Sequence, residues 1–278
     1  MNSKTDSKMS ETNAISPQPG RSFANRVQRV TTDEPFHWLA AGWSDFRAAL
    51  GASVGYGLIF VVAGLVLTGS LLATDLIYLF FPLATGFMLV GPLLTIGFYA
   101  ISRDLERGEP PSFTRAMLAL RSNPAPLFYV GLALLYLFLL WMRLEQLVFA
   151  LSFPTTVGLD LRSLVDATLF TPGGQMFMAI SLPMGAVIAA LTFTGGAFSL
   201  PLLLDRPVGM VEAVATSWTA VVTNLPAMAV WAVMLVLLTA AGMGAGFIGL
   251  AVTLPLAGHA TWHAYRAVIR PDRSEPGG

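Results

Sequence analysis

The chain has 278 residues, of which 55% are hydrophobic and 12% are charged, and its mean hydropathy is +0.67. Soluble domains carry charge on roughly a quarter of their residues. This composition therefore excludes an ordinary soluble domain and indicates an integral membrane protein. The 16 basic and 16 acidic residues balance, which gives no support for a nucleic-acid partner. The absence of cysteine excludes disulfides and thiolate metal sites.

The two ends of the chain are polar. Residues 1–34 are rich in Ser, Thr, Asn, Pro and charge, and they lack the apolar run of a secretory signal. We predict a disordered cytoplasmic tail over 1–34, a membrane domain over 35–270, and a cytoplasmic C-terminal tail over 271–278.

Six apolar stretches are long enough to cross about 30 Å of hydrocarbon, which takes roughly 20 helical residues. They lie near residues 52–73, 76–100, 125–142, 176–204, 225–241 and 243–262. The runs are continuously apolar rather than alternating, which excludes the strands of a barrel. Short gaps after the first and fifth stretches predict tight antiparallel turns. We predict an all-α bundle of six transmembrane helices in three hairpins.

The basic residues are distributed unevenly between the two predicted sides. Fourteen of the 16 Lys and Arg residues fall before the first span, between the second and third, between the fourth and fifth, or after the sixth. Only Arg143 and Arg162 fall on the opposite side. Because basic residues are retained in the cytoplasm, both termini are predicted to be cytoplasmic.

Amphipathic segments precede the first, third and fifth spans. The apolar residues recur at spacings of three and four over 36–50 and 208–222, and a shorter copy covers 113–120. These segments are predicted to be interfacial helices. We infer three successive units, each with an interfacial helix, an outward span and an inward span that contains proline. The alternative is that alanine-rich apolar hairpins resemble one another by chance.

Local strings across about residues 35–270 resemble a family of predicted bacterial integral membrane proteins of unknown function, domain-of-unknown-function family 2189. The strings are GWSD at 42–45, GYG at 55–57, GFMLVGP at 86–92, LWMRL at 140–144 and GHATWHAYR at 258–266. The resemblance implies a six-span bacterial inner-membrane protein. Some members are labelled cytochrome c oxidase subunit I-like, but that subunit has six haem and copper histidines and this chain has three histidines in total.

Three groups of residues are candidates for a site. His259 and His263 are four residues apart, so they share a helix face and could ligate a metal or haem. The alternative is an aromatic interfacial belt beside Trp262. Arg103, Glu106 and Arg107 could bind a headgroup or phosphate.

The alternative for the arginine group is a solvated helix end, in which pairs such as Arg103 with Glu106 stabilise the helix. Trp141 and Arg143 form the third group, at the outer end of the third span. They mark the outer interface unless that helix continues to about residue 153, in which case the charges there need partners.

No recognisable catalytic motif is present, and no ionisable residue falls in the central part of any span. The sequence predicts no cofactor and gives no support to an enzyme. We expect a protein that binds membrane lipid or a small apolar solute, or that supports another membrane complex. Its expected partners are lipids, a second copy of the chain or another membrane protein. The alternatives are a metal or haem accessory of a respiratory complex, built on His259 and His263, and an uncoupled channel.

Overall fold

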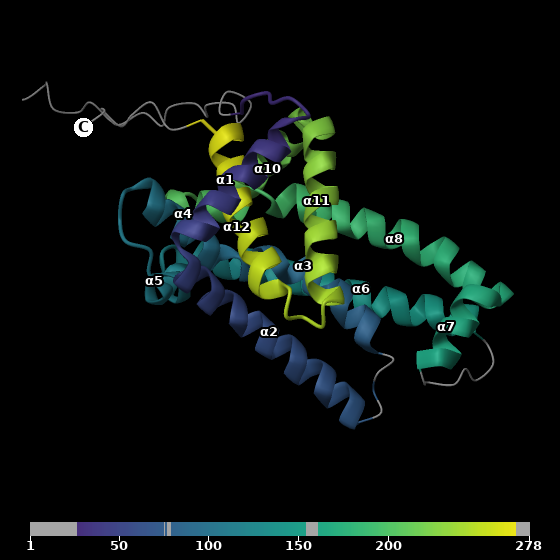
Figure 1. Ribbon diagram of the computed structural model, residues 1–278. Helices are drawn as coiled ribbons and strands as arrows, with labels where there is room; N and C mark the ends of the chain where they lie inside the picture. Colours follow the sequence, from purple (N-terminus) through teal and green to yellow (C-terminus); the bar gives the residue numbers. More distant parts are fainter. Residues whose placement is uncertain (1–26, 75, 77–78, 154–160, 271–278) are drawn as a thin grey trace, which may run out of the picture.

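The computed structural model describes residues 27–74, 76, 79–153 and 161–270 (Figure 1). The regular structure in these residues is helical, apart from one isolated bridge between Val27 and Ile269. The helices are α1 (Glu34–Ala48), α2 (Leu50–Ala73), α3 (Phe80–Leu94), α4 (Ile96–Glu106), α5 (Phe113–Leu118), the short 3-10 helix η3 (Ala119–Arg121), α6 (Pro124–Ser152), α7 (Leu161–Phe170), α8 (Pro172–Gly196), α9 (Ser199–Asp205), α10 (Met210–Thr223), α11 (Leu225–Gly244) and α12 (Leu250–Val268).

Four helical segments in the described residues are long and apolar enough to cross a membrane. They are α2, α6, the combined α8–α9 segment Pro172–Asp205, and α11. They correspond to the first, third, fourth and fifth predicted spans. The second predicted span falls on α3 and α4, which are interrupted at Thr95. The sixth falls on α12, which is largely buried among other helices.

The three amphipathic segments form helices ahead of α2, α6 and α11. α1 ends at Ala48 directly before α2, α5 and η3 precede α6, and α10 is separated from α11 by Asn224. The first two inward segments also resemble one another, because each consists of a longer helix followed, after a short break, by a shorter one: α3 then α4, and α8 then α9. α12 contains Pro255 and is unbroken.

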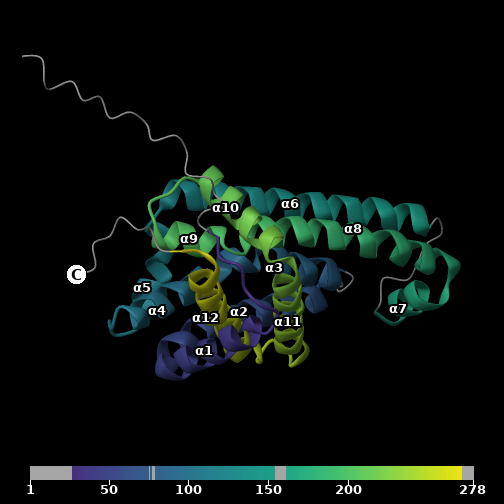
Figure 2. The same cartoon turned by 90° about the horizontal axis from the view of Figure 1, so that it is seen from above.

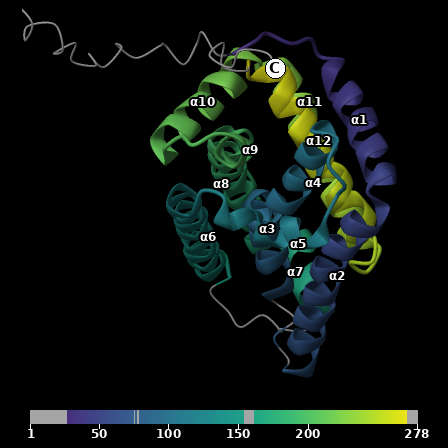
Figure 3. The same cartoon turned by 90° about the vertical axis from the view of Figure 1, so that its left-hand side faces the viewer.

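Packing between these helices repeats around the molecule. α1 packs on α12, α5 packs on α4, and α10 packs on α9. The amphipathic helices of the second and third units therefore cover the inward segment of the preceding unit. The amphipathic helix of the first unit, α1, covers the inward segment of the third unit, α12. The inward ends α4, α9 and α12 contact one another. In Figure 3, α1 and α10 lie on opposite outer flanks of this group.

The hairpin formed by α6 and α8 extends away from the rest of the bundle. The two helices run side by side, with α7 at their far end and with α11 and α12 inclined to them (Figures 1 and 2). α7 lies between α6 and α8 in the chain, and Thr171 caps α8 by accepting a hydrogen bond from the Gly174 N–H at 3.1 Å. α3 packs on α6, whereas α2 packs on α12.

Residues 27–33, which the sequence assigns to the disordered tail, are held at the end of α12. The Gln28 N–H donates to the Val268 carbonyl at 2.8 Å. The Asn224 side chain accepts from the Val30 N–H and donates to the Gln28 carbonyl, both at 2.9 Å. The rest of that tail and the predicted C-terminal tail, 271–278, lie outside the described residues.

Two glycines allow α12 to be surrounded closely. A Cβ atom at Gly42 of α1 would lie 2.6 Å from the Ala260 backbone nitrogen, and one at Gly57 of α2 would lie 3.1 Å from the Ala251 carbonyl oxygen. These contacts are with backbone, which cannot rotate away. Small residues at these positions therefore set the separation of α1 and α2 from α12.

Replacing Gly42 with alanine should destabilise the protein. The added methyl group meets the Ala260 backbone, and overpacking of this kind costs about 1–3 kcal/mol. Thermal unfolding of the purified protein in detergent measures the effect. The control is Gly51→Ala in α2, where an added Cβ has nothing within 4 Å and alanine favours the helix by about 1 kcal/mol. Equal unfolding temperatures for the two variants would contradict the close α1–α12 contact.

Candidate functional site

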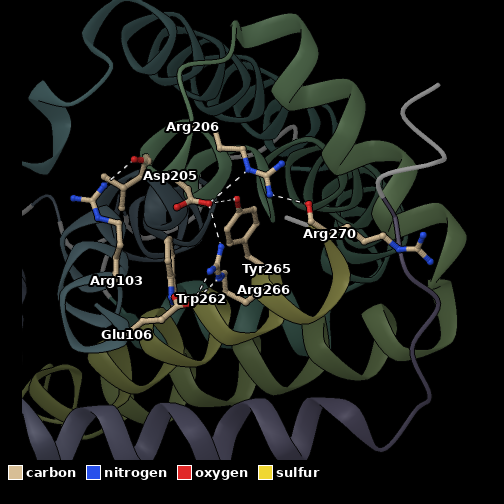
Figure 4. Close-up of polar contacts among 9 residues, drawn as sticks. Arg103, Glu106, Asp205, Arg206, Trp262, Tyr265, Arg266 and Arg270 are labelled. Atoms are coloured by element: carbon tan, nitrogen blue, oxygen red, sulfur yellow. Dashed lines mark hydrogen bonds and ion pairs between the residues drawn. The ribbon is translucent and has the colours of Figure 1, made fainter. Parts of the chain in front are cut away.

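The inward ends of α4, α9 and α12 bring a set of charged and aromatic side chains together (Figure 4). We call this set the arginine cluster; it consists of Arg103 and Glu106 from α4, Asp205 and Arg206 at the end of α9, and Trp262, Tyr265 and Arg266 from α12. Each of the three ends supplies one arginine. The two carboxylates, Glu106 and Asp205, lie between them.

Glu106 connects α4 to α12. Its carboxylate accepts the Trp262 indole N–H at 3.0 Å and the Arg266 Nε–H at 2.9 Å. The Arg266 guanidinium lies 5.9 Å from the centre of the Trp262 ring, within range of a cation–π contact. Glu106 thus neutralises Arg266 and satisfies an indole that is otherwise buried.

Asp205 connects α9 to α12. Its Oδ2 atom accepts the Tyr265 hydroxyl at 2.6 Å and Arg266 Nη1 at 3.4 Å, and it lies 3.7 Å from Arg206 Nε. Burial raises the pKa of Tyr265, and the neighbouring Asp205 carboxylate raises it further. Tyr265 therefore stays protonated and acts as a donor.

Arg103 and Arg206 are only partly satisfied by the protein. Arg103 Nη1 donates to the Leu204 carbonyl and Arg206 Nη2 donates to the Arg270 carbonyl, both at 2.8 Å. In the described residues, however, Arg103 Nε and Arg206 Nη1 are buried and have no hydrogen-bond acceptor. Burial lowers the pKa of Arg103, and the nearby Arg107 lowers it further. Figure 4 shows Arg103 and Arg206 on opposite sides of Asp205.

The expected ion pairs along one helix are replaced by pairs between helices. Glu106 binds α12 rather than Arg103, and Asp104 is buried and accepts from Arg115 Nε at 2.8 Å. The expected pairing of Arg103 with Glu106 is therefore wrong, although Glu106 and Arg107 at this helix end are exposed. The spacing along α4 allows such pairs, but groups on α5, α9 and α12 bond to these side chains instead.

A second group lies beside the arginine cluster and links α1, α2, α4 and α12. We call it the serine–histidine chain, and its members in order are Ser53, His259, Ser102, Asp45 and His263. Ser53 Oγ lies 2.9 Å from His259 Nε2, and Ser102 Oγ lies 2.8 Å from His259 Nδ1. Asp45 Oδ2 accepts Ser102 Oγ at 2.7 Å and His263 Nε2 at 2.8 Å.

The direction of each bond in this chain follows from the Asp45 carboxylate, which accepts. Because the Ser102 hydroxyl donates to Asp45, its oxygen accepts from His259 Nδ1–H. The other ring nitrogen, Nε2, then accepts from the Ser53 hydroxyl. His259 is thus held as one neutral tautomer, and both of its ring nitrogens are engaged by serine hydroxyls.

The structure places His259 and His263 near the same carboxylate, at different depths. His259 is fully buried, whereas the His263 side chain is 33% exposed and pairs with Asp45. Within the described residues, no three His, Cys, Asp or Glu side chains gather closely enough to hold a metal ion. Metal ligation by His259 would require the serine hydrogen bond at one of its two ring nitrogens to be given up.

Trp141 and Arg143 lie far from these two groups, on α6. The helix continues to Ser152, so the condition that makes its charges need partners is met. Glu145 accepts the Ser181 hydroxyl of α8 at 3.0 Å, and Arg143 Nη1 donates to Gln146 at 3.2 Å. Trp141 is buried against Gly185 of α8. Glu145 and Trp141 therefore join α6 to α8, whereas Arg143 bonds within α6, and none of the three belongs to the arginine cluster.

Arg103 and Glu106 are the members of the arginine cluster that the sequence predicts, whereas Arg206, Tyr265 and Arg266 are members that it does not predict as site residues. The available signal was the repeat: each inward segment ends in a short charged string, at 103–107, 205–206 and 265–270. Aligning the three ends would have brought their arginines to one place. The serines of the serine–histidine chain carry no such signal, because serine is common in apolar helices.

Residues 80–205 match the model of a family described as predicted integral membrane protein (DUF2189). The match begins with α3 and ends with α9, and it confirms the resemblance over that range. The strings at 42–57 and 258–266 lie outside it. No curated protein and no solved structure matches the chain. The match and the apolar helices together indicate a multi-pass integral membrane protein.

The Asp45→Asn variant should be less stable than the wild type by about 1–3 kcal/mol near neutral pH, because the buried Ser102 hydroxyl and the half-buried His263 ring lose a charged acceptor. Burial alone would raise the pKa of Asp45, but hydrogen bonds from His263 and Ser102 outweigh it and hold that pKa below its ordinary value of 3.8. The stabilisation that the ionised Asp45 carboxylate provides is therefore complete above pH 3.8. It is lost as the pH falls through the lower pKa of Asp45 in the folded state.

Thermal unfolding as a function of pH checks this prediction. The gap between the two proteins should shrink as the pH falls below 3.8. Asp166→Asn, at an exposed carboxylate 3.9 Å from Arg162, is the matched control and should follow the wild type throughout. A gap that is constant with pH would show that Asp45 contributes no ionised acceptor.

Proposed function

We propose that this chain is a non-catalytic, six-span protein of a bacterial inner membrane, with both termini in the cytoplasm, which binds the headgroup of an anionic lipid at the arginine cluster. The observation that carries the proposal is the pair of buried guanidinium N–H groups, on Arg103 and Arg206, that have no acceptor among the described residues. The span count, the lipid and the orientation are each supported by separate features.

The six-span count is supported by hydrogen bonds that join distant parts of the chain. Ser102 on α4 bonds to Asp45, which precedes α2, so the two lie on one side of a bilayer. If α2 crosses, then α3–α4 must cross back. Likewise Asp205 precedes α11 and bonds to Arg266 near the end of α12, so a crossing by α11 requires a return by α12. The spans α6 and α8–α9 form a complete pair that crosses and returns. Arg103, which precedes α6, bonds to Leu204 near the end of α9, so both lie on one side of the bilayer.

The orientation is supported by the same cluster. It contains Arg103, Arg206 and Arg266, and most other basic residues lie in the connected segments. Only Arg143, in the outer half of α6, and Arg162, on α7, lie toward the opposite side under this arrangement. Retention of basic residues in the cytoplasm then places the arginine cluster and both termini inside.

The charge of the cluster favours an anion. Three arginines face two carboxylates, both of which already accept several donors. A phosphate oxygen would accept a remaining guanidinium N–H through a charge-assisted bond, and arginine is well suited to this geometry. Basic pockets between helix ends on the cytoplasmic side of membranes are a common form of headgroup site. The apolar helices beside it would contact the chains of the same lipid.

The other hypotheses receive less support. A metal or haem accessory would use His259, whose two ring nitrogens are already bonded to serines. An uncoupled channel needs a continuous polar path, whereas a hollow on α10 and another between α2 and α3 are lined almost wholly by apolar side chains.

Accessibility of single cysteines tests the six-span topology, and the natural chain provides a cysteine-free background. We expect a membrane-impermeant thiol reagent to label Arg162→Cys in intact spheroplasts, and to label Arg29→Cys, Arg121→Cys and Arg270→Cys only after lysis. If only the four apolar segments crossed, Arg121 would be outside and Arg162 inside. The reversed labelling of these two positions would overturn the six-span proposal.

Lipid retention tests the binding proposal. In nanodiscs that mix phosphatidylglycerol with phosphatidylcholine, native mass spectrometry should show selective retention of phosphatidylglycerol by the wild type. Arg206→Gln and Arg103→Gln should each weaken retention about tenfold or more, because a hydrogen bond to a charged group contributes about 1.5–3 kcal/mol. Arg162→Gln removes an equal charge from an exposed side chain on α7 and should have no effect.

Two results would contradict the lipid proposal. Equal retention of the two lipids by the wild type would remove the preference for an anion. Displacement of phosphatidylglycerol by millimolar inorganic phosphate, with no loss of the preference for anions, would assign the cluster to a soluble phosphate instead.

A further inference from the structure

A hollow lies along the C-terminal half of α2, and none of the residues that line it belongs to the arginine cluster. It is a crevice of about 100 Å³ between α2, α3 and the turn that joins α11 to α12. Of the residues that line it, Thr68 is the one with a polar side chain. The predicted tight hairpin of the first two spans would have filled this space, but α3 packs on α6 and α2 packs on α12, which leaves the crevice between them.

The ring of Phe247 forms one end of the crevice. It makes an edge contact with Phe80 of α3, with ring centroids 6.2 Å apart. It also covers Gly64 of α2, where an added Cβ would overlap the ring. Glycine at position 64 is therefore what admits Phe247 between the two helices.

The backbone at Phe247 is in the left-handed region, with a φ of 65°, and it follows Gly246, which has the same φ. Among the described residues Phe247 is the one non-glycine residue with a positive φ. A bulky side chain rarely adopts this conformation, and such residues persist where the surroundings hold them, often at ligand sites. The turn is thus bent so that an aromatic ring points into the crevice rather than outward.

The surroundings of the crevice identify what would enter it. α2 is one of the candidate membrane spans, and its residues next to the crevice, Leu65, Val66 and Leu72, are exposed. In a multi-pass membrane protein these side chains face lipid. The crevice is narrow, apolar and continuous with that surface, so a flexible hydrocarbon chain fits it better than a polar or a large rigid molecule.

We propose that the crevice between α2 and α3 is a binding site for one acyl chain of a membrane lipid, with the Phe247 ring as one of its walls. The chain enters from the side of α2 and packs against the apolar residues of α2 and α3. Met243 and Leu250 line the site beside the Phe247 ring. This site is distinct from the arginine cluster and requires no charged headgroup.

Photo-crosslinking tests the proposal. The full chain is placed in nanodiscs of phosphatidylcholine that contain a small fraction of phosphatidylcholine with a diazirine on one acyl chain. Peptide mass spectrometry then locates the adducts. We expect adducts concentrated on the crevice residues of α2, α3 and the 243–250 turn, with fewer on the exposed face of α6.

Variants that fill the crevice provide the decisive comparison. Gly64→Leu on α2 and Ala84→Phe on α3 should each reduce crevice adducts at least about fivefold, whereas Phe247→Ala should raise them about twofold. Gly69→Leu is the matched control, because it is on the same helix, five residues on, and an added Cβ there has nothing within 4 Å. It should leave the adducts unchanged.

Circular dichroism and thermal unfolding verify that each variant is folded, and two filling variants on different helices keep the test valid if one of them does not fold. Adduct yields that are unchanged in both Gly64→Leu and Ala84→Phe would overturn the site. Unchanged yields in Phe247→Ala would overturn the role of the ring. Arg206→Gln should not affect the crevice adducts, so failure of the headgroup proposal would be distinguishable from failure of this one.

Discussion

The arrangement of the chain depends on the hydrogen bonds that tie the ends of α4, α9 and α12 to one another. Glu106 and Asp205 each join two of these helices, and both do so through Arg266. Charged groups near a bilayer are stable only when they are paired or hydrated. The same bonds therefore gather the inward ends of the chain at one face. They also hold the end of α12, which is less apolar than the candidate spans, at the face where α11 begins.

The hydrogen bonds between the inward ends are accompanied by a packing arrangement that repeats in all three units. Each amphipathic helix covers the inward end of the preceding unit, and the relation closes from α1 to α12. A single hairpin could not bury both its charged end and its amphipathic helix. Three hairpins in succession supply one another with partners, in the way that repeats generally need neighbours to bury their surfaces. The third unit differs because α12 is unbroken, which allows it to run through the centre in contact with α1, α2, α4 and α11.

The elements that depend on local pattern could be predicted from the sequence, whereas the partners of individual side chains could not. Hydropathy located the long helices, and the spacing of Phe36, Leu39 and Trp43 located α1, because both signals lie within one helix. The hydrogen bonds of Glu106 with Trp262 and of His259 with Ser53 join residues 156 and 206 positions apart. No periodicity encodes such contacts. Local reasoning about Arg103 and Glu106 gave the wrong partners because it considered only neighbours on the same helix.

The two proposed lipid contacts lie at opposite ends of the spans and differ in chemistry. The arginine cluster offers guanidinium groups and would select the charge of a headgroup, whereas the crevice is apolar and would select only a chain that can bend into it. With the arginine cluster on the cytoplasmic side, the crevice opens toward the outer leaflet, because it is lined by the outer half of α2. One lipid cannot serve both sites across about 30 Å of hydrocarbon. The two leaflets would therefore be engaged separately, by charge on one side and by hydrocarbon shape on the other.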